Sequence, residues 1–172
     1  MTQPPCPYFG TCGGCTSQHL DYSIQLENKK NQLMHATECK DIKVFSGEPY
    51  HYRNRMDFIF HPAGLGFRKR NQWHTIVDVE KCVISNEPLN KLLKEVREFF
   101  KDADTFDPRK HTGTFRYAVI RTPKKMSAIS FVLNDASQRL NEATEKIKAF
   151  AQTTNAEHII VTYAPPNTDI ST

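Results

Sequence analysis

The chain has 172 residues, of which 24% are charged, and a formal net charge of +4; its mean hydropathy is −0.58. This length suits one ordinary domain, with or without a small appendage, that folds without disulfides. No window approaches about 18 consecutive apolar residues, which excludes a typical membrane-spanning helix. The N-terminal residues lack the apolar core of a signal peptide, so we expect a cytoplasmic location and no membrane partner.

The glycine content limits the kinds of enzyme that the chain could be. There are seven glycines, and none of them forms a GxGxxG or GxxxxGK[ST] pattern. Those glycine-rich turns hold the phosphates of nucleotide-like cofactors at the start of a helix. We therefore do not expect a self-contained, cofactor-dependent enzyme in this chain alone.

Three of the five cysteines lie close together in the first segment, CPYFGTCGGC. Cys6, Cys12 and Cys15 have the spacing C-x5-C-x2-C, and three glycines lie among them. Glycine permits the unusual backbone angles that are needed when several thiolates face one centre. An odd number of cysteines without an export signal argues against a disulfide framework. With a distant fourth cysteine, the pattern describes either an all-cysteine zinc site or an iron–sulfur cluster.

The spacing favours one of these two sites without excluding the other. Structural zinc sites usually use two matched pairs of cysteines with short gaps. Here one gap has five residues and the remote partner is a single cysteine, which is more typical of a cubane iron–sulfur cluster. A third interpretation, scattered buried cysteines, fits poorly with three cysteines and three glycines in so short a segment.

After the cysteine loop, the first half of the chain predicts one helix and several strands. Residues 22–37 are expected to form a helix, because Tyr22, Leu26 and Leu33 fall roughly on one face. Strands are expected at residues 43–48, 52–60, from 65 onward and 75–84. In the segment 52–60 the apolar side chains occupy even positions, which is typical of a half-buried strand. A turn near residues 62–64 makes a hairpin, and the last of these strands carries Cys82.

The second half predicts another helix at residues 87–101, capped by Ser85 or Asn86 and with Pro88 in its first turn. Two strands, a helix and a final strand are expected at residues 114–122, 126–134, about 135–152 and 158–164. This order predicts an α+β fold, in which a mixed, mostly antiparallel sheet has helices on one face. The last residues, PPNTDIST, lack a closing element, so we expect a chain that is interrupted after a strand.

Positive charge is concentrated in two segments of the chain. Residues 53–70 carry a net charge of +4 and residues 109–125 carry +6, so the rest of the chain is acidic. Aromatic residues are interleaved with or flank these charges: Tyr50, Tyr52, Phe67, Trp73, Phe115 and Tyr117. This combination suits single-stranded or looped RNA, because bases stack on rings while phosphates meet guanidinium groups. The alternative is a solvated basic face above core aromatics.

Five segments in order carry a family resemblance: CPYFGTCGGCTSQH, YRNRMDFIF, LGFRKR, IVDVEKCVI and GTFRYAVIRT. They resemble the RNA uridine-5-methyltransferases, and the match runs from residue 6 to about residue 122. The resemblance implies an enzyme that uses S-adenosylmethionine to form 5-methyluridine in tRNA or rRNA. It also implies a [4Fe-4S] cluster, which many members of the family carry.

Carried over to this chain, the resemblance implies that Cys6, Cys12, Cys15 and Cys82 are the cluster ligands. Cys39 matches no ligand, and we expect it to be a partly buried free thiol. Residues 1–40 would form the iron–sulfur loop and linking helix, and residues 41–172 the central RNA-binding α+β domain. Contacts with RNA are expected from basic residues of the two charged segments: Arg53, Arg55, Arg68, Lys69, Arg70, Arg116, Arg121, Lys124 and Lys125.

The resemblance also implies a Rossmann-like catalytic domain, which would follow residue 172 and is absent from the sequence. S-adenosylmethionine would bind only there, so no catalytic residue is assigned in this chain. We expect a truncated gene product, an expressed fragment, or half of a split enzyme with a separate catalytic chain. Two alternatives remain: a stand-alone iron–sulfur protein that binds RNA without catalysis, and a zinc-binding structural module.

Overall fold

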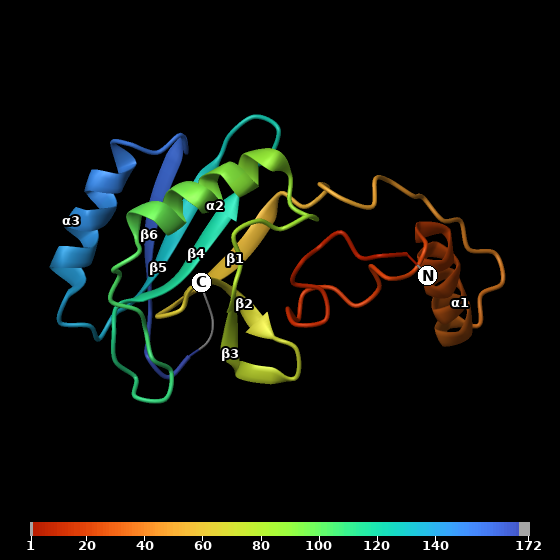
Figure 1. Cartoon of the computed structure of the whole chain (residues 1–172), viewed down its shortest axis with the longest axis horizontal. Helices are drawn as coiled ribbons and strands as arrows, with labels where there is room; N and C mark the ends of the chain where they lie inside the picture. The colour runs from red at the N-terminus through yellow and green to blue at the C-terminus, as the bar shows by residue number, and fades with distance from the viewer. Residues whose placement is uncertain (1, 169–172) are drawn as a thin grey trace.

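A computed structural model describes residues 2–168 of the protein, shown in Figure 1. The elements follow one another as α1 (Tyr22–Thr37), β1 (Arg55–His61), β2 (Gly64–Lys69), β3 (Gln72–Asp78), α2 (Glu87–Phe99), β4 (Phe115–Arg121), β5 (Ala128–Asn134), α3 (Leu140–Ala151) and β6 (His158–Ala164). None of the helices in this part of the chain has the length and apolar character needed to cross a bilayer.

The six strands form one sheet in the order β3-β2-β1-β4-β5-β6. Neighbouring strands are antiparallel except β5 and β6, which pair in parallel. A parallel pair needs a long crossover connection, and α3 lies within that connection. The predicted α+β fold with a mixed, mostly antiparallel sheet is therefore confirmed.

The two helices α2 and α3 cover the same face of the sheet, as Figure 1 shows. Phe100, directly after α2, lies at the centre of this core. Its ring centroid is 5.3 Å from that of Phe115 in β4, 4.9 Å from Phe131 in β5 and 5.2 Å from Phe150 in α3. Each fully buried ring of this kind stabilises the fold by about 1.5–3 kcal/mol. The aromatic cluster therefore joins α2 and α3 to the central strands.

The start of α2 follows the sequence closely. Asn86 is the capping residue, and its side-chain oxygen accepts a hydrogen bond from the Leu89 N–H at 2.9 Å. Pro88 lies in the first turn, where its missing N–H costs no helical hydrogen bond. The cap also reaches the sheet, because Thr122 Oγ1 is 2.8 Å from the Asn86 side-chain oxygen. The predicted cap thus fixes both the beginning of α2 and its position beside β4.

Three predicted elements were wrong in extent or existence. No strand forms at residues 43–48, where Val44 and Phe45 are exposed and no neighbouring strand is present to pair with them. β3 ends at Asp78, so Cys82 lies in the turn before α2 and not in a strand. α3 begins at Leu140, because the Asn134 and Ser137 side chains accept backbone N–H groups and hold residues 134–139 in turns.

The N-terminal region lies at one end of the sheet, with the cysteine loop beside β2 and β3 and with α1 farther out (Figure 1). The predicted helix is confirmed at Tyr22–Thr37. However, none of its residues is buried, so its apolar side chains do not join the core beneath α2 and α3. Glu38, in the left-handed conformation, ends the helix.

Candidate cysteine site and basic surface

The cysteine loop is built from tight backbone turns. The Phe9 N–H donates to the Cys6 carbonyl at 3.1 Å, and the Cys12 N–H donates to the Tyr8 carbonyl at 2.8 Å. Gly10 lies between these turns with a φ of +84°, a left-handed conformation that residues with a Cβ atom rarely adopt. The glycine in this position therefore lets the chain reverse between Cys6 and Cys12.

Backbone hydrogen bonds fasten this loop to the turn between β2 and β3. The Gly13 N–H donates to the Arg68 carbonyl at 3.0 Å, and the Arg70 N–H donates to the Thr11 carbonyl at 2.8 Å. A side chain on Gly13 would lie 3.1 Å from the same carbonyl oxygen of Arg68. Glycine is thus needed here for close approach, and the loop extends the sheet by one short bridge between Cys12 and Lys69.

The fourth cysteine is positioned by α2. Asn90 is 5% exposed, and its side chain accepts from the Cys82 N–H at 2.9 Å and donates to the Cys82 carbonyl at 3.1 Å. On the other side of the same turn, the Glu80 N–H donates to the Tyr8 hydroxyl at 3.1 Å. Neither contact was predicted from the sequence. The only signal was a polar residue, Asn90, within the apolar face of α2.

These contacts bring Cys6, Cys12, Cys15 and Cys82 to the wall of one cavity of about 580 Å³. Cys82 is buried and the other three are partly buried. Cys39 lies outside the cavity and is exposed, so the expectation that it is partly buried was wrong. Burial is the main cause that raises the pKa of the Cys6 and Cys12 thiols, and the neighbouring cysteines raise it further. The raised pKa favours the neutral form of these two thiols, whereas a bound cation would favour their thiolate form.

The geometry by itself does not show a metal site. Within residues 2–168, no three or more His, Cys, Asp or Glu side chains are arranged to hold a metal ion. What the structure shows is four cysteines from two distant segments around one cavity. The iron–sulfur cluster therefore stays a prediction.

The sheet topology brings most of the basic residues from the two charged segments to one end of the sheet. Arg55 at the start of β1 lies directly opposite Arg121 at the end of β4. β2 runs antiparallel to β1, so Lys69 and Arg70 also lie at this end. The turn after β4 carries a further pair of lysines at residues 124–125. Their proximity depends on strand order, which the charge pattern alone did not indicate.

Arg53 connects this end of the sheet to the cysteine site. Its N–H donates to the Ile84 carbonyl at 2.8 Å, and its carbonyl accepts from the Asn86 N–H at 2.8 Å. Its side chain lies along the cysteine cavity, where Arg70 and Lys81 are also found. Basic groups therefore border the space that the four cysteines surround.

Arg116 has a different environment from the other predicted RNA contacts. It is 5% exposed, and its guanidinium donates to the carbonyls of Pro165, at 2.6 Å, and Thr168. It also lies over the ring of Phe106 at 4.4 Å from the centroid. These contacts connect β4 to the segment after β6, so we do not count Arg116 among the basic residues that are available at the end of the sheet.

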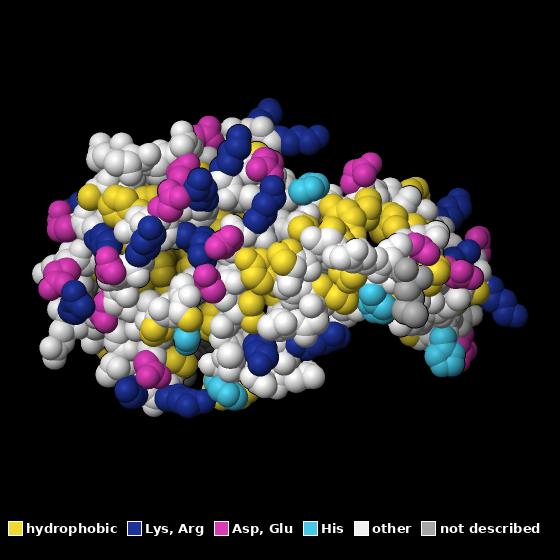
Figure 2. Space-filling view, viewed as in Figure 1, with side chains coloured by type: hydrophobic (Ala, Val, Ile, Leu, Met, Phe, Trp, Pro, Cys, Tyr) yellow, Lys and Arg dark blue, Asp and Glu magenta, His cyan; other side chains and the backbone are white. Residues whose placement is uncertain are grey.

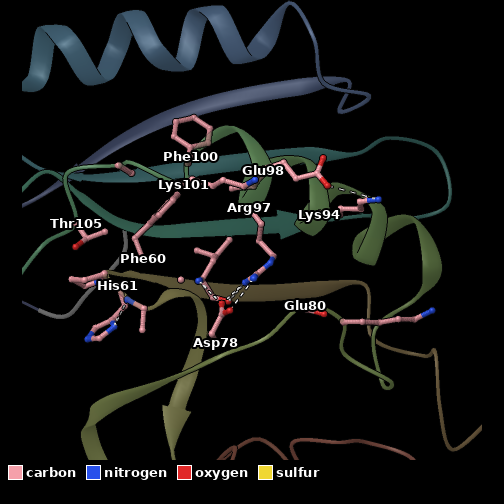
Figure 3. A pocket seen from close by; sticks show the side chains of 17 residues that line it. Phe60, His61, Asp78, Glu80, Lys94, Arg97, Glu98, Phe100, Lys101 and Thr105 are labelled. Atoms are coloured by element: carbon pink, nitrogen blue, oxygen red, sulfur yellow. Dashed lines mark hydrogen bonds and ion pairs between the residues drawn. The ribbon is translucent and has the colours of Figure 1, made fainter.

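A second cavity, of about 640 Å³, lies between α2 and the β1–β2 hairpin (Figure 3). At its wall Arg97 and Asp78 form a two-pronged ion pair, with Arg97 Nη2 2.9 Å from Asp78 Oδ2. The hydrogen bonds from Arg97 are the main cause that lowers the pKa of Asp78. The Leu65 N–H donates to the same carboxylate at 2.9 Å. This pair therefore fastens β2 and β3 to α2 and is not poised to exchange a proton.

Charges on the face that α2 occupies are mixed in sign. Figure 2 shows basic and acidic side chains intermixed over the part of the molecule that carries α2 and α3. Several of them form ion pairs, such as Lys94 with Glu98 and Arg139 with Glu142. Hydrophobic side chains gather instead over the N-terminal region of the chain, toward the right of this view. The helix-covered face therefore offers no uniform positive surface to a polyanion.

Comparisons with known proteins give relatives of one kind, although no family model matches the chain. The chain is 35% identical over 123 residues to a tRNA (uracil(54)-C(5))-methyltransferase of Pyrococcus abyssi, which covers 70% of this chain and 30% of that protein. It is 34% identical over 165 residues to an uncharacterized RNA methyltransferase of Clostridium acetobutylicum, covering 86% of this chain and 36% of that protein.

A solved structure resembles the fold over nearly the whole chain. The crystal structure of the Pyrococcus abyssi tRNA (uracil-54, C5)-methyltransferase in complex with S-adenosyl-L-homocysteine matches with a TM-score of 0.74 and 27% identity. The match covers 93% of this chain and 38% of that one. The chain thus spans about a third of the length of these relatives. The similarity supports a relationship to the RNA uracil-C5 methyltransferase family, which the sequence motifs indicated.

Proposed function

We propose that this chain is the cluster-binding and RNA-binding part of an S-adenosylmethionine-dependent methyltransferase that forms 5-methyluridine in tRNA or rRNA. The observation that carries this proposal is the similarity over most of the chain to RNA methyltransferases, in sequence and in fold. The chain spans about a third of those relatives. Cofactor binding and methyl transfer are therefore assigned to residues outside it.

Within this function, Cys6, Cys12, Cys15 and Cys82 would hold a [4Fe-4S] cluster. Four cysteines around one cavity suit the four corners of a cubane. Gln18 lines the same cavity, is 7% exposed, and has neither amide atom hydrogen-bonded within the described residues. Its N–H group could donate to a cluster sulfur. The cluster is negatively charged when bound by four thiolates, so the bordering Arg53, Arg70 and Lys81 would stabilise it.

The cluster would have a structural role at this position. Residues 6–15 and Cys82 meet at this cavity, and of the loop's apolar side chains Tyr8 and Cys15 are only partly buried against the core. Metal ligation that joins distant segments contributes directly to the free energy of folding. The cluster would thereby hold the N-terminal loop against the β2–β3 turn and beside the basic end of the sheet.

The RNA would bind at that basic end. Arg55, Lys69, Arg70 and Arg121, with the lysines at residues 124–125, lie on strand ends and turns that the topology places together. Arg55 is partly neutralised by Asp57, which accepts two hydrogen bonds at 3.1 Å from it. In the part of the chain that the structure describes, acidic residues of the neighbouring strands do not pair with the other basic side chains of this group, so their positive charge is suited to binding phosphates.

The experiment that tests this function measures nucleosides in the organism that encodes the chain. After deletion of the gene, tRNA and rRNA are separated, digested and analysed for 5-methyluridine by mass spectrometry. We expect 5-methyluridine to disappear from one defined position in one of the two RNA classes. Unchanged 5-methyluridine at every position in both classes would refute the proposal.

A separate measurement tests the cluster. The chain is purified without oxygen and analysed for iron, acid-labile sulfide and zinc. We expect a brown protein with about four iron atoms and about four sulfides per chain. A colourless protein that contains zinc in place of iron would show a structural zinc site instead.

A further inference from the structure

The face of the sheet that α2 and α3 leave uncovered carries side chains of a different kind. Phe58, Phe67 and Ala118 point into the core under the helices. Their neighbours Ile59, Arg68 and Tyr117 alternate with them along β1, β2 and β4 and therefore lie on the opposite face. This second face combines apolar, aromatic and cationic groups.

A cavity of about 360 Å³ opens on this face, between the strands and the loop at residues 105–109. Trp73 in β3 lies at its wall and is 63% exposed, which is unusual for so large a ring. The Arg68 guanidinium lies 5.9 Å from the centre of the indole ring and donates to the Trp73 carbonyl at 2.7 Å. These two contacts hold the exposed indole in place at the wall of the cavity.

The other walls of the cavity add a ring and a second cation. Tyr117 lines it from β4, and Arg109 lines it from the loop. Asp107 is the one acid in the described lining; its carboxylate accepts from the Arg109 N–H at 2.9 Å and the Lys110 N–H at 3.3 Å. These bonds turn its charge toward the backbone of its own loop, and Arg109 places a cation at the opening.

This combination matches one unpaired nucleotide. An exposed indole offers a flat surface on which any base can stack, while flanking guanidinium groups attract the phosphate. The volume lies within the range of pockets that hold small ligands. A base inside a duplex already stacks on its neighbours and could not reach the indole, so a looped or single-stranded nucleotide fits best.

We propose that this cavity binds an unpaired nucleotide of the RNA substrate, with its base stacked on Trp73 and its phosphate near Arg109. The inference rests on the proposed RNA-binding function and adds a second contact region, on the uncovered face of the sheet and distinct from the cysteine site. It would select RNA that presents an unpaired nucleotide.

The test uses the indole as its own reporter, because Trp73 is the only tryptophan in the chain. The full chain is titrated with a dye-labelled single-stranded RNA oligomer and with a blunt RNA duplex of the same sequence. Anisotropy of the dye measures binding, and tryptophan emission measures stacking. We expect the single strand to quench the emission with the same midpoint as the anisotropy change, and the duplex to leave the emission unchanged.

Variants extend the measurement to affinity. W73A removes the surface on which one base stacks and should therefore weaken binding of the single strand about 5- to 150-fold. W73F keeps an aromatic ring and should keep most of the affinity. Tyr163→Ala, at an exposed aromatic on the edge strand β6, is the matched control and should bind like the unaltered chain.

Two results would overturn the inference in distinguishable ways. If anisotropy shows binding while tryptophan emission stays constant and W73A binds normally, the cavity is not a nucleotide site but RNA binding stands. Equal quenching by the duplex would refute the preference for an unpaired nucleotide. If neither RNA changes the anisotropy, the RNA-binding function itself fails, and the inference fails with it.

Discussion

The sheet domain and the cysteine loop bury very different amounts of apolar surface. Around Phe100, the rings of Phe115, Phe131 and Phe150 pack in one continuous core beneath α2 and α3. The cysteine loop adds only the partly buried Tyr8 and Cys15 to this core and attaches mainly through backbone hydrogen bonds to Arg68 and Arg70, and α1 beyond it has no buried residue. Hydrophobic burial suffices for the sheet, whereas the proposed cluster would contribute to fixing the N-terminal region.

The largest expected effect is on the cluster. Cys82→Ser should abolish most of the bound iron and make residues 2–20 sensitive to proteases, because the cluster loses one thiolate and its link to the segment that carries residue 82. The Asn90 hydrogen bonds use the backbone of Cys82 and should survive, so the sheet should stay folded. Iron analysis after anaerobic purification measures the effect. Cys39→Ser, at the exposed cysteine, is the control, and equal iron loss in both variants would contradict the ligand assignment.

A comparable change in the sheet core should act on the other region alone. Phe131 is fully buried, and Phe131→Ala should lower the free energy of unfolding by about 3–5 kcal/mol, because it removes a ring and leaves a cavity. Guanidinium titration followed by circular dichroism measures this loss. Phe45→Ala removes the same group from a 92% exposed position and should change stability by less than about 0.5 kcal/mol. Similar losses in the two variants would refute this account of the core.

A smaller effect is expected at the basic end of the sheet. If about five phosphates are contacted, the logarithm of the RNA affinity should fall with the logarithm of salt concentration at a slope of about −3.5. Arg121→Gln should make that slope shallower by about 0.7, because one counterion fewer is released. Lys148→Gln, on α3 and paired with Glu145, should leave the slope unchanged. A slope that is flat in the unaltered chain would eliminate this surface as a phosphate site.

The smallest effect concerns the pH dependence of stability. The pKa of Asp78 is lowered in the folded state, chiefly by its hydrogen bonds with Arg97. Its contribution is therefore present above the unfolded pKa of about 3.9 and is lost as pH falls through the folded value. Urea titrations between neutral and acid pH should show a smaller loss of stability on acidification for Asp78→Asn than for the unaltered chain. Identical acid dependence in both would mean that the ion pair is not linked to folding.

Local sequence signals predicted most of the elements. The even-numbered apolar residues Met56, Phe58 and Phe60 are buried on β1, and Asn86 caps α2 as expected. Prediction failed where tertiary contacts decide. Residues 43–48 have strand-like composition but no neighbouring strand, and the turn at residues 134–139 is held by side-chain hydrogen bonds that compete with a helix.

The site was predictable only in part, for the same physical reason. The spacing of Cys6, Cys12 and Cys15 and the family motifs identified the cysteines, but no local signal placed Cys82 beside them. That placement depends on Asn90 in α2 and on Tyr8, which hydrogen-bond to the turn containing Cys82. Likewise, Arg116 has the same charge as its neighbours, yet its burial against Phe106 could not be read from composition.

The sequence by itself determined the α+β class, the alternation of buried side chains and the positions of charge and cysteine, because these depend on residue type and spacing along the chain. The tertiary structure alone decided which of them meet. Antiparallel pairing of β1 with β2 and β4 placed two distant basic segments at one end of the sheet. The pairing of β2 with β3 likewise brought Trp73 beside Arg68 at the cavity on the uncovered face, because the register between strands is set by tertiary contacts.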